Sequence, residues 1–213
     1  MDFRLEAPFK PAGDQPAAID ALGRIGSVSG VPALSALAAS DDAERATAAI
    51  HALGGIPDPE VWTPLRVALR AEQEVRRAAA ARSTAQLGGA EAIELLEWTA
   101  AADTSEMVVS AAVEGLTAIA NEATLGPAAV KALVELAADG SRRDLVIPAL
   151  AAVPAALIEH VARGLRDPRA TVRVTVLQAL GCMRRAEASH WLQAALDDEI
   201  PEVRLAAITE LRH

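Results

Sequence analysis

The sequence predicts an all-α fold, a right-handed α-solenoid of about six helical hairpins that follow a short extended N-terminal segment. One observation is that an apolar helix, an acidic turn and a second apolar helix recur at intervals of roughly 27–34 residues. Another is that hydrophobic residues make up 52% of the chain but aromatic residues only 2%, which indicates closely packed helices with small side chains. Because one hairpin cannot bury its apolar face alone, such units must stack on their neighbours.

Residues 167–181 form the clearest unit. Asp167 is expected to cap a helix, and Pro168 fits the first helical position, where a missing N–H costs nothing. The apolar residues of this segment share one helix face: Val172, Val176, Leu177 and Leu180. Gly181 is expected to end the helix in a left-handed conformation. The Val-Arg pair of this helix recurs 31 residues later at Val203-Arg204, which sets the repeat length.

The other hairpins follow the same order of helix, turn and helix. The predicted helix pairs are residues 32–39 and 42–53, residues 57–69 and 74–87, and residues 90–101 and 106–120, with further hairpins over 126–153, 154–181 and 192–211. Pro148 is expected to remove one backbone hydrogen bond and bend its helix, so the curvature should change near residues 140–156. Residues predicted to face the core include Val61, Trp62, Leu65, Leu69, Met107, Val108, Val109 and Val113.

The pattern L-x-x-x-L-x-D-x-x-x-x-V-R-x-x-A-x-x-A-L-G resembles the HEAT-like repeats of the phycobilin-lyase type, over about residues 31–213. The resemblance implies the α-solenoid fold and, because such arrays mostly serve as binding surfaces, a binding role. We therefore divide the chain into an N-terminal segment, residues 1–30, and a solenoid, residues 31–213.

Residues 1–24 do not fit the repeat and begin extended, because Pro8 and Pro11 bias the preceding residues away from helix. The stretch FKPAGDQPAAIDAL, residues 9–22, resembles the start of the UvrB family of bacterial excision repair. The resemblance implies contacts of Phe9 and Gln15 with an adenine. However, residues 26–30 contain no phosphate-binding lysine, so ATP hydrolysis is not expected. Three interpretations remain: an end cap, which we favour, a mimic that engages a repair partner, or a vestigial nucleotide contact.

Composition narrows the function. A net charge of −9 argues against general nucleic-acid binding, although a local basic groove remains compatible with it. The single cysteine, Cys182, excludes an internal disulfide and a Cys-based zinc site, and it is predicted to be buried and inert. The four histidines lack metal-ligand spacing, so we expect neither a metal nor a cofactor. Without a long apolar stretch or a signal segment, the chain is predicted to be cytoplasmic and not in a membrane.

Arginine recurs at the start of most second helices. The members of this predicted stripe are Arg45, Arg76, Arg77, Arg142, Arg143, Arg173 and Arg204. One interpretation is a ladder between repeats, in which the arginines pair with turn carboxylates such as Asp42, Asp139, Asp167 and Asp198. The other is a partner-binding groove for an acidic peptide or a phosphate backbone. Trp62, Trp98 and Trp191 are interpreted as packing residues and not as a stacking platform.

The function predicted from these observations is a non-enzymatic scaffold that binds a protein, expected to be acidic, through the concave face of its second helices. One alternative is an accessory factor of DNA repair that contacts a repair subunit or DNA. Another is a bilin lyase or chaperone-like protein. The last helix carries an apolar stripe wider than one neighbour can cover: Val203, Leu205, Ala206, Ile208 and Leu211. Either the solenoid continues in a longer protein or, as we favour, this end forms a homo-oligomer.

Overall fold

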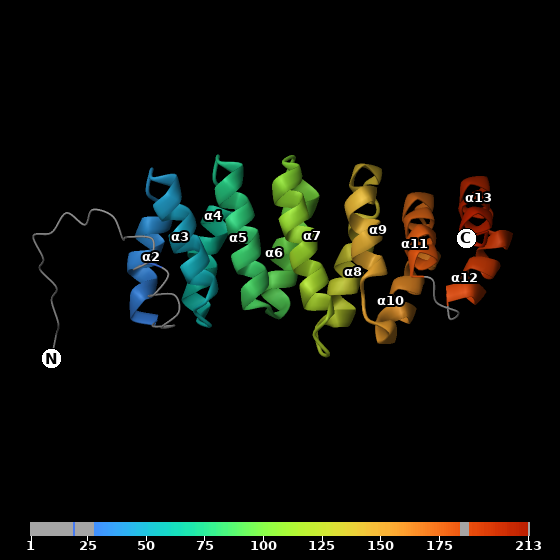
Figure 1. Cartoon of the computed structure of the whole chain (residues 1–213), viewed down its shortest axis with the longest axis horizontal. Coiled ribbons are helices and arrows are strands. Elements are labelled where there is room, and N and C mark those ends of the chain that lie inside the picture. The colour runs from blue at the N-terminus through green and yellow to red at the C-terminus, as the bar shows by residue number, and fades with distance from the viewer. Residues whose placement is uncertain (1–18, 20–27, 184–187, 213) are drawn as a thin grey trace, which may run out of the picture.

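The structure is a row of helical hairpins, as the repeat predicted. This computed structural model describes Ile19, residues 28–183 and residues 188–212. That part of the chain contains twelve α-helices, several short 3-10 helices and no β-strand. The helices form one elongated array, and each hairpin contacts mainly the hairpins next to it (Figure 1). None of these helices is long and apolar enough to cross a membrane.

Each hairpin has a first and a second helix, and the described residues contain six such pairs. The pairs are α2 (Val31–Ala38) with α3 (Ala43–Gly54), α4 (Trp62–Ala68) with α5 (Glu74–Leu87), α6 (Gly89–Ala102) with α7 (Glu106–Ala120), α8 (Gly126–Leu136) with α9 (Arg143–Ala151), α10 (Ile158–Ala162) with α11 (Ala170–Cys182), and α12 (Ser189–Ala194) with α13 (Pro201–Glu210). The 3-10 helices are η1 (Val28–Gly30), η2 (Pro59–Val61), η3 (Gly140–Arg142), η4 (Ala155–Leu157), η5 (Arg163–Arg166) and η7 (Ala195–Asp197).

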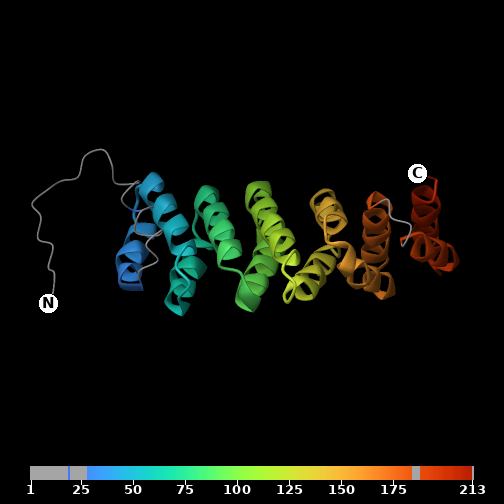
Figure 2. The same cartoon turned by 60° about the horizontal axis from the view of Figure 1, so that its bottom comes forward.

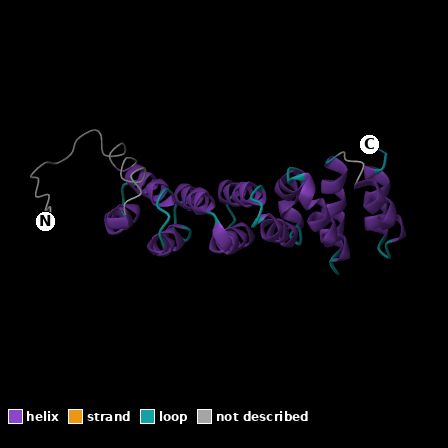
Figure 3. Ribbon diagram, turned by 90° about the horizontal axis from the view of Figure 1, so that it is seen from below, coloured by secondary structure: helices purple, strands orange, loops and turns teal. Residues whose placement is uncertain are grey.

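Two layers result from this order. The second helices pack on one another along the whole row (Figure 2). Consecutive first helices contact each other less at both ends of the row, but α6 and α8 pack closely in its middle. Seen from below, the last two hairpins are turned relative to the first three (Figure 3). The core is a continuous strip of leucine, valine, isoleucine and alanine between the layers.

Small residues let the second helices approach closely. A Cβ added at Gly54 of α3 would lie 2.7 Å from Ser83 Cβ of α5, and one at Gly115 of α7 would lie 2.7 Å from Ala85 Cβ. A Cβ at Gly181 of α11 would collide with the Glu210 carboxylate of α13. A close crossing with a glycine on one helix therefore recurs between α3 and α5, between α5 and α7, and between α11 and α13.

The predicted end of α11 at Gly181 was wrong, because α11 continues to Cys182. Gly181 serves the crossing with α13 and not a left-handed stop. The glycines with positive φ are instead Gly88 and Gly89, at 66° and 87°, which let α6 follow α5 without a loop. The predicted cap was also displaced: α11 begins at Ala170, and Asp167 accepts the backbone N–H of Arg169 in the turn before it.

Most predicted core residues are buried. Val61, Leu65 and Leu69 are buried, and so are Val108, Val109 and Val113. Met107 was predicted wrongly, because 44% of its surface is exposed at the start of α7. Pro148 lies within α9, which continues past it to Ala151.

Candidate partner-binding surfaces

Three of the stripe arginines close the turns of their own hairpins. Arg77, Arg173 and Arg204 each donate from Nη1 to the two carbonyls five and six residues upstream, at 2.7–3.2 Å. Each of them is the fourth residue after the N-cap of its second helix. The same sequence position therefore satisfies the same turn carbonyls in three different hairpins.

Two of these arginines also reach forward to the next hairpin. Arg77 donates to Asp103 from Nε at 2.6 Å and from Nη2 at 3.1 Å. Arg173 lies 2.9 Å from both carboxylate oxygens of Asp198. Both pairs are mostly buried, with only 7% of the Arg173 side chain exposed. The Arg77 pair is bidentate, whereas Arg173 hydrogen-bonds Asp198 through Nη2, and its Nε makes only an ion-pair contact with the other oxygen. The two pairs join the second hairpin to the third and the fifth to the sixth.

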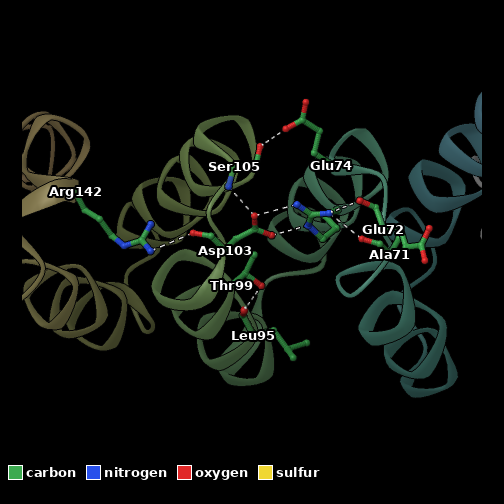
Figure 4. Close-up of polar contacts among 9 residues, drawn as sticks. Ala71, Glu72, Glu74, Leu95, Thr99, Asp103, Ser105 and Arg142 are labelled. Carbon is green, nitrogen blue, oxygen red and sulfur yellow. Dashed lines mark hydrogen bonds and ion pairs between the residues drawn. The ribbon is translucent and has the colours of Figure 1, made fainter.

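Other arginines reach backward. Arg76 donates from Nη2 to Ser40 O at 2.5 Å, and Arg142 donates to Ala101 O and Asp103 O at 2.9 and 3.2 Å. Figure 4 shows the result: Asp103 lies between Arg142 on one side and the turn of the second hairpin on the other. Asp103 thus joins three consecutive hairpins.

The other arginines near the turns make contacts that are more exposed or less complete. Arg45 contacts Asp42 at 3.1 Å, with the two side chains 46% and 43% exposed. Arg143 is half-buried, and its Nε has no hydrogen-bond partner among the described residues. Between the fourth and fifth hairpins, Arg169 lies 2.8 Å from Glu135 with both side chains 42% exposed. The ladder interpretation is confirmed for the arginines that bind turns, while a role of the stripe in partner binding stays a prediction.

The ladder keeps its carboxylates ionised. Burial alone would raise the pKa values of Asp103 and Asp198, but hydrogen bonds from arginine and backbone N–H groups outweigh it and leave both below their usual range. A hydrogen bond from Arg169 lowers the pKa of Asp167, and one from Ser141 lowers that of Asp139. Glu97, on α6, differs: burial and the nearby Glu135 raise its pKa.

The sequence did not single out Asp103, although a signal was present. Asp103 lies two residues before the N-cap Ser105, as Asp167 and Asp198 do relative to their own N-caps. Aligning the hairpins on their turns, and not on the Val-Arg pair, would have placed Asp103 in the ladder. The Val-Arg pair is missing from α7, which has Val108 and Val109 there.

The second helices present a continuous outer surface, which we call the second-helix face. Its exposed members recur every three or four residues on each helix and include Glu44, Val75, Arg82, Met107, Glu114, Asp144 and Glu202. Among these exposed residues, glutamate and aspartate outnumber arginine. Val75 and Met107 are 52% and 44% exposed and occupy the same position, two residues after the N-cap, on the adjacent helices α5 and α7.

Three clefts open between first helices. The cleft between α2 and α4 has a volume of about 1110 Å³ and is lined by Val31, Pro64 and Val67 among others. A cleft of about 310 Å³ lies between α4 and α6, and one of about 570 Å³ lies beside α12. The wall of the middle cleft contains Trp98, with the Arg70 guanidinium 5.3 Å from its ring centroid.

Two further predictions were wrong. Trp98 is 47% exposed and carries a cation–π contact, so it is not a packing residue, whereas Trp62 and Trp191 are partly buried against the core. Cys182 is exposed at the end of α11 and not buried.

No group of three metal-ligating side chains occurs among the residues that the structure describes. Phe9 and Gln15 lie outside those residues.

The sequence profile of HEAT repeats matches residues 14–85. This match gives no support to the resemblance of residues 9–22 to the UvrB family. No curated protein matches the chain.

The solved structures that are similar to this chain include the following three. Human deoxyhypusine hydroxylase in complex with glycerol shares 20% identity, with 96% of this chain and 81% of that chain covered and a TM-score of 0.39. The complex of CpcE and CpcF of phycocyanin lyase from Nostoc sp. PCC7120 shares 19% identity, with 86% and 99% covered and a TM-score of 0.40. A designed armadillo repeat protein in complex with the peptide (KR)4 shares 18% identity, with 92% and 91% covered and a TM-score of 0.40.

Proposed function

We propose that the chain is a non-enzymatic scaffold that binds another protein through its second-helix face. The observation that carries this proposal is the pair of exposed apolar side chains, Val75 and Met107, on neighbouring helices of that face. Helices that pack directly have axes roughly 8–10 Å apart, so both side chains fall within one contact area of a partner. The surrounding side chains are short or charged, which suits a rim around an apolar centre.

The chemistry of the face favours a partner that presents basic groups beside an apolar side chain. The expectation of an acidic partner depended on the arginine stripe, and five of its seven members donate hydrogen bonds to turns of this chain. Carboxylates such as Glu44 and Glu114 are exposed on the face, with Arg82 as an exposed arginine between them. The same charges oppose the approach of a nucleic-acid backbone.

Affinity capture from the native lysate tests the proposal with a matched pair of variants. Val75→Glu combined with Met107→Glu should abolish capture, because each change places a charge in the apolar centre of the contact. Val67→Glu changes a side chain that is 64% exposed on α4, in the first-helix layer, and should leave capture intact. Equal capture by all three proteins would refute the proposed face, and so would loss of capture with Val67→Glu alone.

A further inference from the structure

The last hairpin leaves an apolar end surface uncovered. Among the described residues, nine large apolar side chains are exposed, and four belong to this hairpin: Leu196, Leu205, Ile208 and Leu211. Leu205 is 64% exposed and Ile208 40% exposed, whereas Val203 and Ala207, on the side of α13 toward the core, are buried. We call the surface formed by Leu205, Ile208 and Arg212 the end face.

The repeat shows what this face corresponds to. Val174 and Leu177 of α11 lie 31 residues before Leu205 and Ile208. In α11, Leu177 is fully buried and Val174 packs against the core, in a helix that α13 covers. The end face is therefore equivalent to a contact surface between repeats, but nothing described in the structure packs on it.

One residue distinguishes the end face from that contact surface. Counted from the N-cap, Arg212 occupies the position that holds Gly54 in α3, Ala85 in α5 and Gly181 in α11. In those three hairpins the next second helix crosses closely at that position, whereas α7 holds Thr117 there. Arg212 is larger than the residues at this position in α3, α5 and α11, and it adds a positive charge at one edge of the end face.

We propose that the end face binds a second copy of this chain, with the two α13 helices antiparallel across a two-fold axis. This proposal is independent of the proposed scaffold function. If Leu205 of one copy packs on Ile208 of the other, Glu202 lies beside Arg212 of the second copy at both ends of the contact. Neither Glu202 nor Arg212 has an ion-pair partner within the described residues, so the face is complementary in charge to itself.

Sedimentation velocity of the purified full chain, over about a hundredfold range of concentration, tests the proposal without any other partner. The chain should dimerise, and Leu205→Glu should raise the dimer dissociation constant at least about tenfold, equivalent to about 1.4 kcal/mol. Val67→Glu is the matched control, because Val67 is also 64% exposed but lies on α4. Circular dichroism of each variant verifies that the fold is retained.

A charge swap tests the antiparallel arrangement. Glu202→Arg and Arg212→Glu should each weaken the dimer, and the double variant should restore it because each pair is re-formed with reversed charges. A chain that stays monomeric at every concentration would overturn the proposal. A dimer that is equally sensitive to Val67→Glu, or that the double swap fails to restore, would overturn it as well. Loss of dimerisation with retained capture of a protein partner would separate this surface from the second-helix face.

Discussion

The buried arginine of the fifth hairpin offers a direct measure of what the ladder contributes. Arg173→Met keeps the aliphatic stem but removes a guanidinium that binds two turn carbonyls and the carboxylate of Asp198. Removing one partner of a buried ion pair costs about 3–5 kcal/mol. Because the Asp198 side chain keeps 15% of its exposure, we take the lower end of that range. The free energy of unfolding of the last hairpin should therefore fall by about 3 kcal/mol.

Arg45→Met is the matched control. Arg45 also pairs with a turn aspartate, but its side chain is 46% exposed, so the loss should stay below about 1 kcal/mol. Arg173→Lys should fall between the two, because lysine keeps the charge but lacks the guanidinium that reaches Asp198 and the two turn carbonyls together.

Urea unfolding followed by circular dichroism and by tryptophan fluorescence measures the effect. Since each hairpin is stabilised mainly by its neighbours, the loss should be local, and α12 and α13 should unfold first. With Trp62 and Trp98 changed to Phe, Trp191 of α12 reports on this end alone, and its transition should precede the transition in ellipticity. If Arg173→Met shifts the midpoint no more than Arg45→Met does, the ladder contributes no more than an exposed pair and the reasoning fails.

Three further outcomes follow from the structure. Gly115→Val should cost about 1–3 kcal/mol in thermal melts because α5 and α7 cross there, whereas Gly140→Ala, with open space around it, should stay within about 0.5 kcal/mol; equal losses would contradict the crossing. Asp103 has a lowered pKa, so its contribution to stability is present above about pH 4 and is lost as the pH falls through the folded-state pKa. Asp103→Asn should therefore be less stable at neutral pH and lose less stability on acidification, and unchanged acid curves would contradict this. Arg70→Ala should shift the emission of Trp98 with a stability loss of about 1 kcal/mol or less, and an unchanged spectrum would argue against the cation–π contact.

The hairpins could be predicted because their signal is local and repeated. Apolar spacing, turn aspartates and prolines are read within one unit, and the unit recurs along the chain. The arginine stripe could be located but not interpreted, because a sequence gives the position of Arg77 or Arg173 but not the direction of its guanidinium. That direction depends on which carbonyls and carboxylates the neighbouring hairpin brings near.

Most of the errors share a cause, since they involved contacts between hairpins. Gly181 looks like a helix stop until Glu210 of the next second helix is placed over it. Trp98 and Cys182 look like packing residues, but their exposure depends on how far apart neighbouring helices lie. The spacing of helices in space has no counterpart in the pattern of a single repeat.

The uneven strength of the links along the row has a mechanical consequence. Asp103 ties the second, third and fourth hairpins together, and the buried contact of Arg173 with Asp198 ties the fifth to the sixth. Across the boundary between these two blocks, the ion pair of Arg169 with Glu135 is half open to solvent. This boundary is therefore the one between the blocks whose polar link salt can weaken, although α9 and α11 still pack on each other there. A partner long enough to span it would hold the two blocks at a fixed angle.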